Sequence, residues 1–190
     1  RMLDRAGLPA RVTGADLLPA VCHAAASRDF SVYFFGGDPG VADSAAERMR
    51  QAHPQLRVAG TCCPQWGFEQ DESMSMRLID QINESRADVL FLGVGAPKQE
   101  KWGHRYQSLL KVGPIVCVGA AFAFAAGTAR RAPRFLQESG FEWCWRLARE
   151  PRRLWRRYLL DDTRFVVEAM REMRLARRRA SGNHSGVDRS

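Results

Sequence analysis

Short apolar runs alternate with segments of helical periodicity through the first two-thirds of the chain, and this alternation constrains the fold more than any other feature. Strands and helices that alternate at this spacing imply right-handed crossovers between parallel strands, because a parallel pair needs a connection long enough to hold a helix. The sequence therefore predicts an α/β fold with a Rossmann-like, mainly parallel sheet flanked by helices. The expected strands are Ser31–Phe35, Leu56–Thr61, Asp88–Gly93 and Ile115–Val118, and the expected helices are Val41–Ala52 and Met74–Glu84.

The chain changes character after Gly127. From Arg134 to about Arg179 the pattern becomes helical, with tryptophans interleaved among arginines, and a polar, Gly/Ser-rich tail follows. We therefore expect an α/β domain at residues 1–133, a helical Arg/Trp-rich appendage at 134–180 and a disordered tail at 181–190.

The net charge of +8 arises in one segment of the chain. Residues 128–180 contain 15 Arg, no Lys and 7 acidic residues, whereas the residues before and after them balance. Because a guanidinium binds phosphate through two parallel hydrogen bonds, an excess made of arginine alone favours a phosphate-bearing partner: a lipid headgroup, a pyrophosphate or a nucleic acid. No nucleic-acid-binding motif accompanies the charge, which disfavours a nucleic acid. A solvated helical hairpin that packs its aromatic residues on its own core is the alternative.

Neither a membrane span nor a metal site is expected. The uncharged stretch at residues 112–129 approaches the length of a span, but Gly113, Pro114, Gly119 and Gly127 interrupt it, so a strand and a small-residue loop explain it better. The five cysteines show neither a C-x-x-C pair nor a ligand spacing with histidine. This argues against a zinc site and a disulfide framework and favours reduced thiols in a cytosolic protein.

The loop after the first expected strand contains Gly36, Gly37 and Asp38, followed by Pro39 and Gly40. In an open parallel sheet, ligands bind beyond the carboxyl ends of the strands. The missing Cβ atoms here let the backbone approach a ligand, and the following helix offers its N-terminal amides to an anion. A tight strand-to-helix turn explains the same residues equally well.

The loop after the third expected strand, Gly93–Trp102, carries the stronger signal. Gly95 permits close approach, and Lys98, Gln99 and Glu100 stand at the start of a helix. Lys98 suits a phosphate, and the Gln99 amide can donate and accept toward a planar base such as uracil. A capped helix with exposed charges is the alternative, but polar residues that converge on one glycine-rich mouth favour a ligand site.

Small side chains surround Phe122 and Phe124 in the loop at residues 119–127. Phe122 either forms the floor of a pocket or packs in the core, where the small residues around it let a helix lie close to the sheet. The sequence alone favours the packing role.

Five runs, in this order along the chain, carry a resemblance to a known family: RVTGADLL at 11–18, FFGGDPG at 34–40, GVGAPKQEKW at 93–102, GAAFAFAAG with RRAP at 119–133, and GFEWCWRLAREPRRLWRRYL at 140–159. Together, over about residues 8–160, they resemble the WecG/TagA/CpsF family, bacterial glycosyltransferase family 26. The resemblance implies transfer of a sugar, N-acetylmannosamine or another hexose, from a UDP-sugar to a polyprenyl-diphosphate-linked acceptor in cell-surface polysaccharide or teichoic acid biosynthesis. It further implies an inverting, metal-independent reaction without a cofactor, in the cytoplasm at the inner face of the bacterial plasma membrane. Assembly into a homo-oligomer stays open.

The resemblance also assigns roles to residues. Arg11 resembles the family's active-site arginine, suited to stabilising charge on the departing diphosphate, and Gln99 resembles its nucleotide-site glutamine. Residues 1–133 would then bind the nucleotide sugar, and the appendage would associate with the membrane. The expected substrate-binding residues are Gly36, Gly37, Asp38, Gly95, Lys98, Gln99, Glu100 and Phe122, and the residues expected to meet the lipid diphosphate and an anionic membrane are Arg146, Arg153 and Arg156.

Two departures from the family pattern bear on catalysis. The family's general base is an Asp in an Asp-Gly motif upstream of the Arg-Val-x-Gly segment, and this sequence starts too late to contain it, so we expect the α/β domain to lack its N-terminal part. Ala123 stands where family members commonly carry Asp. Asp16 and Asp38 are nearby carboxylates, but solvated or helix-capping roles are favoured for both. A truncated or inactive member that acts as a membrane- or partner-binding module is therefore the alternative.

Overall fold

The computed structural model describes residues 12–133 together with Trp145 and Ala148, which are both helical. The chain divides into two compact units, residues 1–130 and 131–190, and the elements below belong to the first. Apart from those two positions, the expected appendage at 134–180 lies outside the described residues, as does the expected tail at 181–190.

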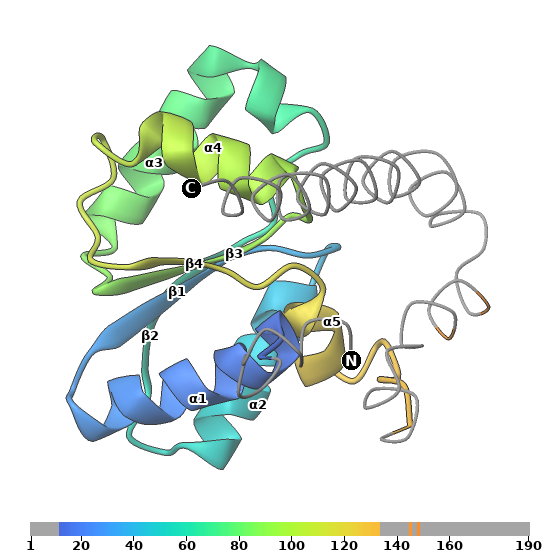
Figure 1. Cartoon of the computed structure of the whole chain (residues 1–190). Coiled ribbons are helices and arrows are strands. Elements are labelled where there is room, and N and C mark those ends of the chain that lie inside the picture. Colours follow the sequence, from blue (N-terminus) through green and yellow to red (C-terminus); the bar gives the residue numbers. More distant parts are fainter. Residues whose placement is uncertain (1–11, 134–144, 146–147, 149–190) are drawn as a thin grey trace, which may run out of the picture. The chain divides into compact units, whose positions relative to one another are not determined.

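An all-parallel sheet of four strands, in the order β2-β1-β3-β4, forms the centre of the first unit (Figure 1). Each connection between successive strands carries a helix, as parallel pairing requires. The predicted α/β fold is therefore confirmed. The elements are α1 (Gly14–Ser27), β1 (Ser31–Gly36), α2 (Val41–Ala52), β2 (Arg57–Cys62), the 3₁₀ helix η2 (Phe68–Gln70), α3 (Glu72–Glu84), β3 (Val89–Gly93), α4 (Lys98–Tyr106), β4 (Ile115–Cys117) and α5 (Ala121–Ala125).

The strands lie within one residue of their predicted ends, whereas helix α1 is not among the predicted elements. Its N-terminus is marked by a capping box, in which the Asp16 carboxylate accepts from the Thr13 hydroxyl at 2.6 Å and from the Thr13 backbone N–H at 3.2 Å. The helix-capping role favoured for Asp16 is confirmed.

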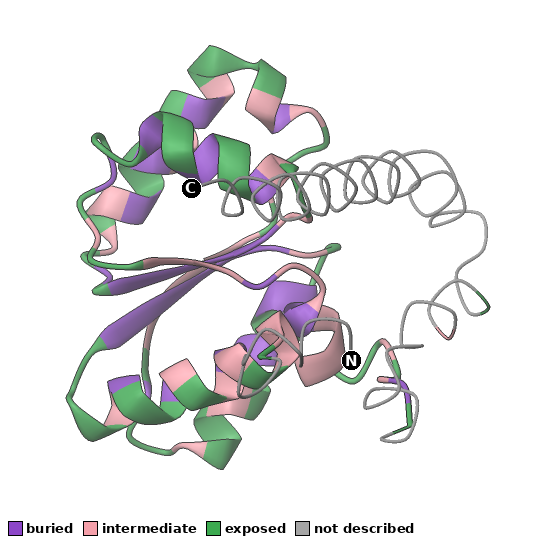
Figure 2. Cartoon of the chain, in the orientation of Figure 1, coloured by how far each residue is buried: buried purple, intermediate pink, exposed green. Residues whose placement is uncertain are grey.

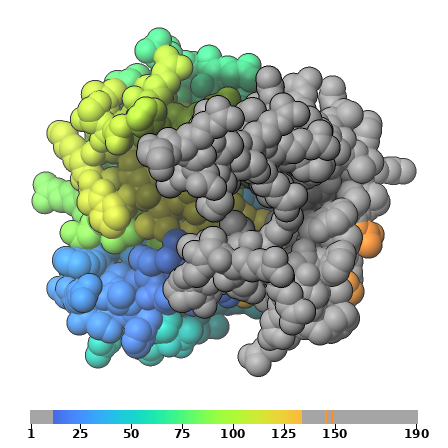
Figure 3. Space-filling model, viewed as in Figure 1, coloured from blue at the N-terminus to red at the C-terminus, as the bar shows by residue number. Residues whose placement is uncertain are grey.

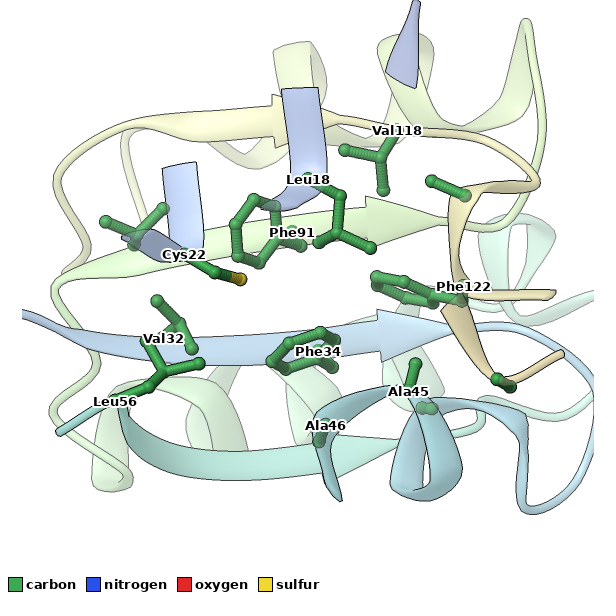
Figure 4. Packing of buried hydrophobic residues seen from close by; sticks show 14 of the residues in the cluster. Leu18, Cys22, Val32, Phe34, Ala45, Ala46, Leu56, Phe91, Val118 and Phe122 are labelled. Carbon is green, nitrogen blue, oxygen red and sulfur yellow. The ribbon is translucent and has the colours of Figure 1, made fainter. Parts of the chain in front are cut away.

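Helices α1, α2 and α5 cover one face of the sheet, in the lower half of Figure 1. The rings of Phe34 and Phe91 project toward them from the two central strands, and Phe122 of α5 packs on Phe34 with ring centroids 5.3 Å apart (Figure 4). Small side chains on the facing helices allow a close approach to these rings. They include Ala25, Ala42, Ala45, Ala46, Ala121 and Ala126.

Helices α3 and α4, with η2, cover the opposite face. Trp102 of α4 stacks on Phe35 of β1, with 5.0 Å between ring centroids and 11° between ring planes, and Phe68 of η2 meets both rings edge-on. The indole N–H of Trp102 donates to the Ser75 hydroxyl at 3.1 Å, and this hydroxyl donates to the Phe68 carbonyl at 2.9 Å. These buried hydrogen bonds fix η2 against α3 and α4.

Burial follows the two layers. All residues of β1 and β3 are buried, as expected for central strands covered on both faces, whereas β2 and β4, at the two ends of the strand order, are mostly half-buried (Figure 2). In the space-filling view, the blue atoms of α1 lie below the yellow-green atoms around α4 (Figure 3).

Candidate functional site

The chain adds β2 on one side of β1 and then crosses back to add β3 on the other side, so the order of strands reverses between the parallel neighbours β1 and β3. The loop after β1 therefore leads to α2 on one face of the sheet, and the loop after β3 leads to α4 on the other, which is the arrangement that opens a ligand-binding crevice. At this point Gly36 is the register partner of Gly93, and Gly37 N donates to Gly93 O at 3.1 Å. The structure thus brings together the two glycine loops that the sequence singled out.

Gly36 allows these loops to meet. Its φ is +124°, a conformation that L side chains rarely adopt, and a Cβ on this residue would lie 2.6 Å from the carbonyl carbon of Gly93. A side chain at this position would push the carboxyl ends of β1 and β3 apart.

The segment after β2 joins the same edge of the sheet. The Cys63 thiol donates to Gly37 O across 3.2 Å. Burial, and then the negative charges of Asp38 and Asp43, raise the pKa of this thiol above its ordinary value. The Asp38 side chain is exposed, and the backbone carbonyl of this residue accepts from Val41 N at 3.0 Å where α2 begins. Asp38 therefore places a negative charge and a helix-starting carbonyl at the tip of the loop.

Gln99 is polar and yet buried, with 4% of its surface exposed. Its Oε1 accepts from Gly119 N at 3.1 Å, and its Nε2 donates to Glu100 Oε1 at 2.8 Å. Its backbone N–H donates to Gly95 O at 3.0 Å. The side chain therefore ties the start of α4 to the loop after β4. An amide nitrogen carries two hydrogens and the bond to Glu100 uses one, and contact with a nucleotide base stays a prediction.

Lys98 is held toward the segment after β2. Its Nζ lies 3.0 Å from Glu69 Oε1 and 4.3 Å from the centroid of the Trp66 ring. A phosphate bound at Lys98 would have to compete with the Glu69 carboxylate. Trp66 and Glu69 are not among the residues that sequence reasoning selected, because no local pattern links them to a helix that begins beyond the next strand.

Phe122 is a core residue, 1% exposed. Its ring packs on Phe34 and underlies Gly93, where a Cβ would come within 2.6 Å of the ring. The packing role that the sequence favoured is confirmed, and it supports the glycine loop from below. Direct contact of Phe122 with a substrate stays a prediction.

Four of the arginines expected to be functional lie outside the described residues: Arg11, Arg146, Arg153 and Arg156. Among the residues that the structure describes, no three His, Cys, Asp or Glu side chains gather as a metal site requires. The described helices include none that is both long and apolar enough to cross a bilayer. The uncharged stretch at 112–129 contains the predicted strand, followed by the short helix α5 where a loop was expected.

The sequence model of the glycosyl transferase WecG/TagA/CpsF family matches residues 1–180. The chain belongs to this family. The resemblance carried by the glycine loops and the arginine-rich runs is therefore confirmed.

Two relatives of this WecG/TagA/CpsF family member bear the same name, N-acetylglucosaminyldiphosphoundecaprenol N-acetyl-beta-D-mannosaminyltransferase. The protein of Bacillus spizizenii is 29% identical over 167 residues, which cover 88% of this chain and 62% of the relative. The protein of Bacillus subtilis is 25% identical over 165 residues, which cover 87% of this chain and 61% of the relative. The chain thus spans about three fifths of the length of the curated relatives it matches.

Proposed function

We propose that this WecG/TagA/CpsF family member takes part in the transfer of a sugar from a UDP-sugar to a polyprenyl-diphosphate-linked acceptor. The family match over residues 1–180 carries the proposal. The names of the two relatives describe transfer of N-acetylmannosamine to N-acetylglucosaminyldiphosphoundecaprenol. N-Acetylmannosamine or another hexose is therefore the proposed sugar, and the inner face of the bacterial plasma membrane is the proposed location.

The glycine loops at the β1 and β3 ends are the proposed nucleotide site. Gly95, in the loop after β3, has open space beside it, because a Cβ there would meet nothing within 4 Å, so a diphosphate can approach the backbone at this residue. Gln99 is the proposed contact for the uracil base, because an amide held in place by Gly119 can donate and accept within one plane.

Sugar transfer also needs charge stabilisation on the departing UDP and removal of a proton from the acceptor hydroxyl. We assign the first task to Arg11. The reaction is proposed to proceed with inversion and without a metal ion, so the acceptor oxygen attacks the sugar carbon on the side opposite to UDP. Arg146, Arg153 and Arg156 are proposed to bind the diphosphate of the lipid acceptor. No base is assigned, because Asp16 caps α1 and Asp38 lies exposed at a loop tip.

Calorimetric titration of the 190-residue chain with UDP tests the nucleotide site. Gln99→Ala should weaken UDP binding about tenfold, the effect of losing one well-placed hydrogen bond and its positioning. Gln107→Ala is the matched control, because Gln107 lies exposed at the C-terminal end of the same helix with its Nε2 3.2 Å from His104 Nδ1. Its UDP affinity should equal that of the parent chain.

Absence of UDP binding by a folded sample would overturn the nucleotide site. If the same sample sedimented with anionic liposomes, the alternative of a membrane-binding module without transferase activity would replace it. Equal weakening by Gln99→Ala and Gln107→Ala would remove the specific role of Gln99.

A further inference from the structure

The two tryptophans within residues 12–133 are placed in opposite ways. Trp102 is 2% exposed in the core, whereas Trp66 is 95% exposed. An indole is among the largest apolar surfaces that a chain can leave in water, and beside a ligand site it offers a flat face to any ligand that has one. Trp66 lies in the segment whose Cys63 thiol bonds Gly37 O, so it belongs to the same sheet edge as the glycine loops.

The backbone next to Trp66 is fixed, although its ring is exposed. The next residue, Gly67, adopts φ +84°, a left-handed conformation that favours glycine, and Phe68 after it is 2% exposed and packs edge-on against Trp102. From the other side Lys98 Nζ lies over the indole at 4.3 Å from its centroid.

Lys98 also lines a pocket of about 390 Å³, a size typical of small-molecule sites. Three lining residues are cationic and one is anionic, so the lining carries net positive charge. The lining residues are Glu69, Pro97, Lys98, Lys101, Trp102 and Arg105.

Glu69 supplies an acceptor that has no donor. Its Oε1 pairs with Lys98, but its Oε2 is shielded from solvent and has no hydrogen-bond partner among the described residues. Such a group is unfavourable unless something donates to it. A ligand hydroxyl can donate to this carboxylate, which only accepts, once the Glu69 side chain turns its buried oxygen toward the pocket that the residue lines.

We propose that Trp66, Glu69 and Lys98 form a subsite for a pyranose ring that carries a phosphate. The apolar face of the sugar stacks on the indole, the Glu69 carboxylate turns to accept from a sugar hydroxyl, and the phosphate lies against Lys101 and Arg105. This proposal rests on the proposed function, in which both the donor and the acceptor contain a hexose joined to phosphate. It adds Trp66, Glu69 and Arg105, which the glycine loops do not include.

Ligand-observed NMR titration of the 190-residue chain with N-acetylglucosamine 1-phosphate tests the subsite. Trp66→Ala should weaken binding at least fivefold, and Trp66→Phe should retain most of the affinity, because a smaller aromatic face still stacks. Leu109→Ala is the control: it removes another exposed apolar side chain, 45% exposed, and should leave the affinity unchanged. Trp66 contributes little to the core, so its variants should fold.

UDP affinity measured on the same samples separates this proposal from the previous one. Trp66→Ala should leave UDP binding unchanged. If the parent chain binds UDP while Trp66→Ala binds the sugar phosphate normally, the subsite is overturned and the nucleotide site stands. If Trp66→Ala instead loses binding to vesicles of anionic phospholipid and keeps the sugar phosphate, the ring is a membrane contact and the subsite is again overturned.

A titration in the presence of saturating UDP identifies the source of the sugar. Sugar phosphate binding that persists with UDP bound, and that still depends on Trp66, assigns the subsite to the acceptor. Displacement by UDP, with the same dependence on Trp66, assigns it to the donor.

Discussion

The two ends of the β1–β3 pair are joined in different ways. At the amino end side chains add to the backbone pairing: beside the 3.0 Å bond from Asp88 N to Ser31 O, Ser31 donates to Asp88 Oδ2 through both its backbone N–H and its hydroxyl, each at 2.7 Å. At the carboxyl end the backbone makes the connection, through the 3.1 Å bond from Gly37 N to Gly93 O, and no side chain lies between the register partners Gly36 and Gly93. The contrast indicates that side chains brace the amino end, whereas at the carboxyl end the two backbones meet directly and leave no room for a side chain.

A side chain at Gly36 should lower the free energy of unfolding more than any other change described below, because it forces apart the strand ends that meet there. Gly36→Ala places a Cβ 2.6 Å from the Gly93 carbonyl carbon at a φ of +124°. We expect the free energy of unfolding to fall by about 3 kcal/mol or more, since strain and overpacking add. Urea denaturation followed by circular dichroism measures the loss.

Gly40→Ala is the matched control for this change. Gly40 also has a positive φ, +78°, but a Cβ there would meet nothing within 4 Å. We expect a loss of about 1 kcal/mol from strain alone. Equal losses in the two variants would mean that the close approach of the strand ends does not matter.

Removing the Gln99 side chain should have the next largest effect at the carboxyl end. Gln99→Ala leaves the Gly119 N–H without its 3.1 Å acceptor, so the free energy of unfolding should fall by about 1–2 kcal/mol. Gln107→Ala, at the exposed C-cap of the same helix, should change it by less than about 0.5 kcal/mol. Unchanged stability in Gln99→Ala would show that the side chain does not brace the two loops.

Sequence reasoning found what depends on local pattern. The alternation of apolar runs placed the central strands, and parallel pairing then required Gly36 and Gly93 to share one edge. Helix α1 carries Pro19 in its interior, which obscures a helical signal, although Thr13 and Asp16 form a recognisable capping pair. The start of the helix after Pro97 was predicted as well.

Contacts between distant segments could not be predicted. The partner of Gln99 is a backbone N–H beyond the next strand, at Gly119, and the partners of Lys98 are Trp66 and Glu69 on the preceding connection. Side-chain amides and ammonium groups can pair with many kinds of partner, so residue type alone does not determine which partner is used. The polar residues at the start of α4 were therefore identified, while the direction in which they point was not.

At the amino end, Ser31→Ala should have a smaller effect than the changes at Gly36 and Gln99. Ser31 is buried, and the variant loses the 2.7 Å hydroxyl bond to Asp88 but keeps the backbone one. We expect a loss of about 1 kcal/mol in the free energy of unfolding. A loss as large as that of Gly36→Ala would reverse the comparison between the two ends.

The amino end should also respond to acid. The backbone bond from Ser31, then its hydroxyl bond, and more weakly the charge of Arg57, lower the pKa of Asp88 below its ordinary value of 3.8. A carboxyl whose pKa is lower in the folded chain than in the unfolded chain stabilises the fold at pH values above its unfolded-state pKa. This stabilisation disappears as the pH falls through its folded-state pKa. The stability difference between the parent chain and Asp88→Asn should therefore be full at neutral pH and shrink below 3.8. A constant difference across this range would contradict the assignment.

The smallest expected effect is a slow alkylation of the Cys63 thiol at the carboxyl end of the sheet. Cys63 is exposed with a raised pKa, so its alkylation should be slow at neutral pH and accelerate as the pH rises through and beyond 9.0, the ordinary value for a thiol. Cys22 is fully buried, and burial raises its pKa to about 12, so it should stay unmodified in the folded chain. Mass spectrometry of the alkylated peptides measures both, and UDP should slow the reaction at Cys63 alone. Equal modification of Cys22 would contradict the described core.

The pairing of β1 with β3 has a consequence for synthesis on the ribosome. Ser31 and Asp88, which begin the two strands' contact, are 57 residues apart in the chain, and β2 emerges between them. Until Gly93 has left the exit tunnel, the apolar run SVYFFG of β1 has one edge without a neighbour and is open to pairing with other nascent chains. A pause in translation before β3 emerges would therefore leave this edge of the apolar strand β1 exposed for longer.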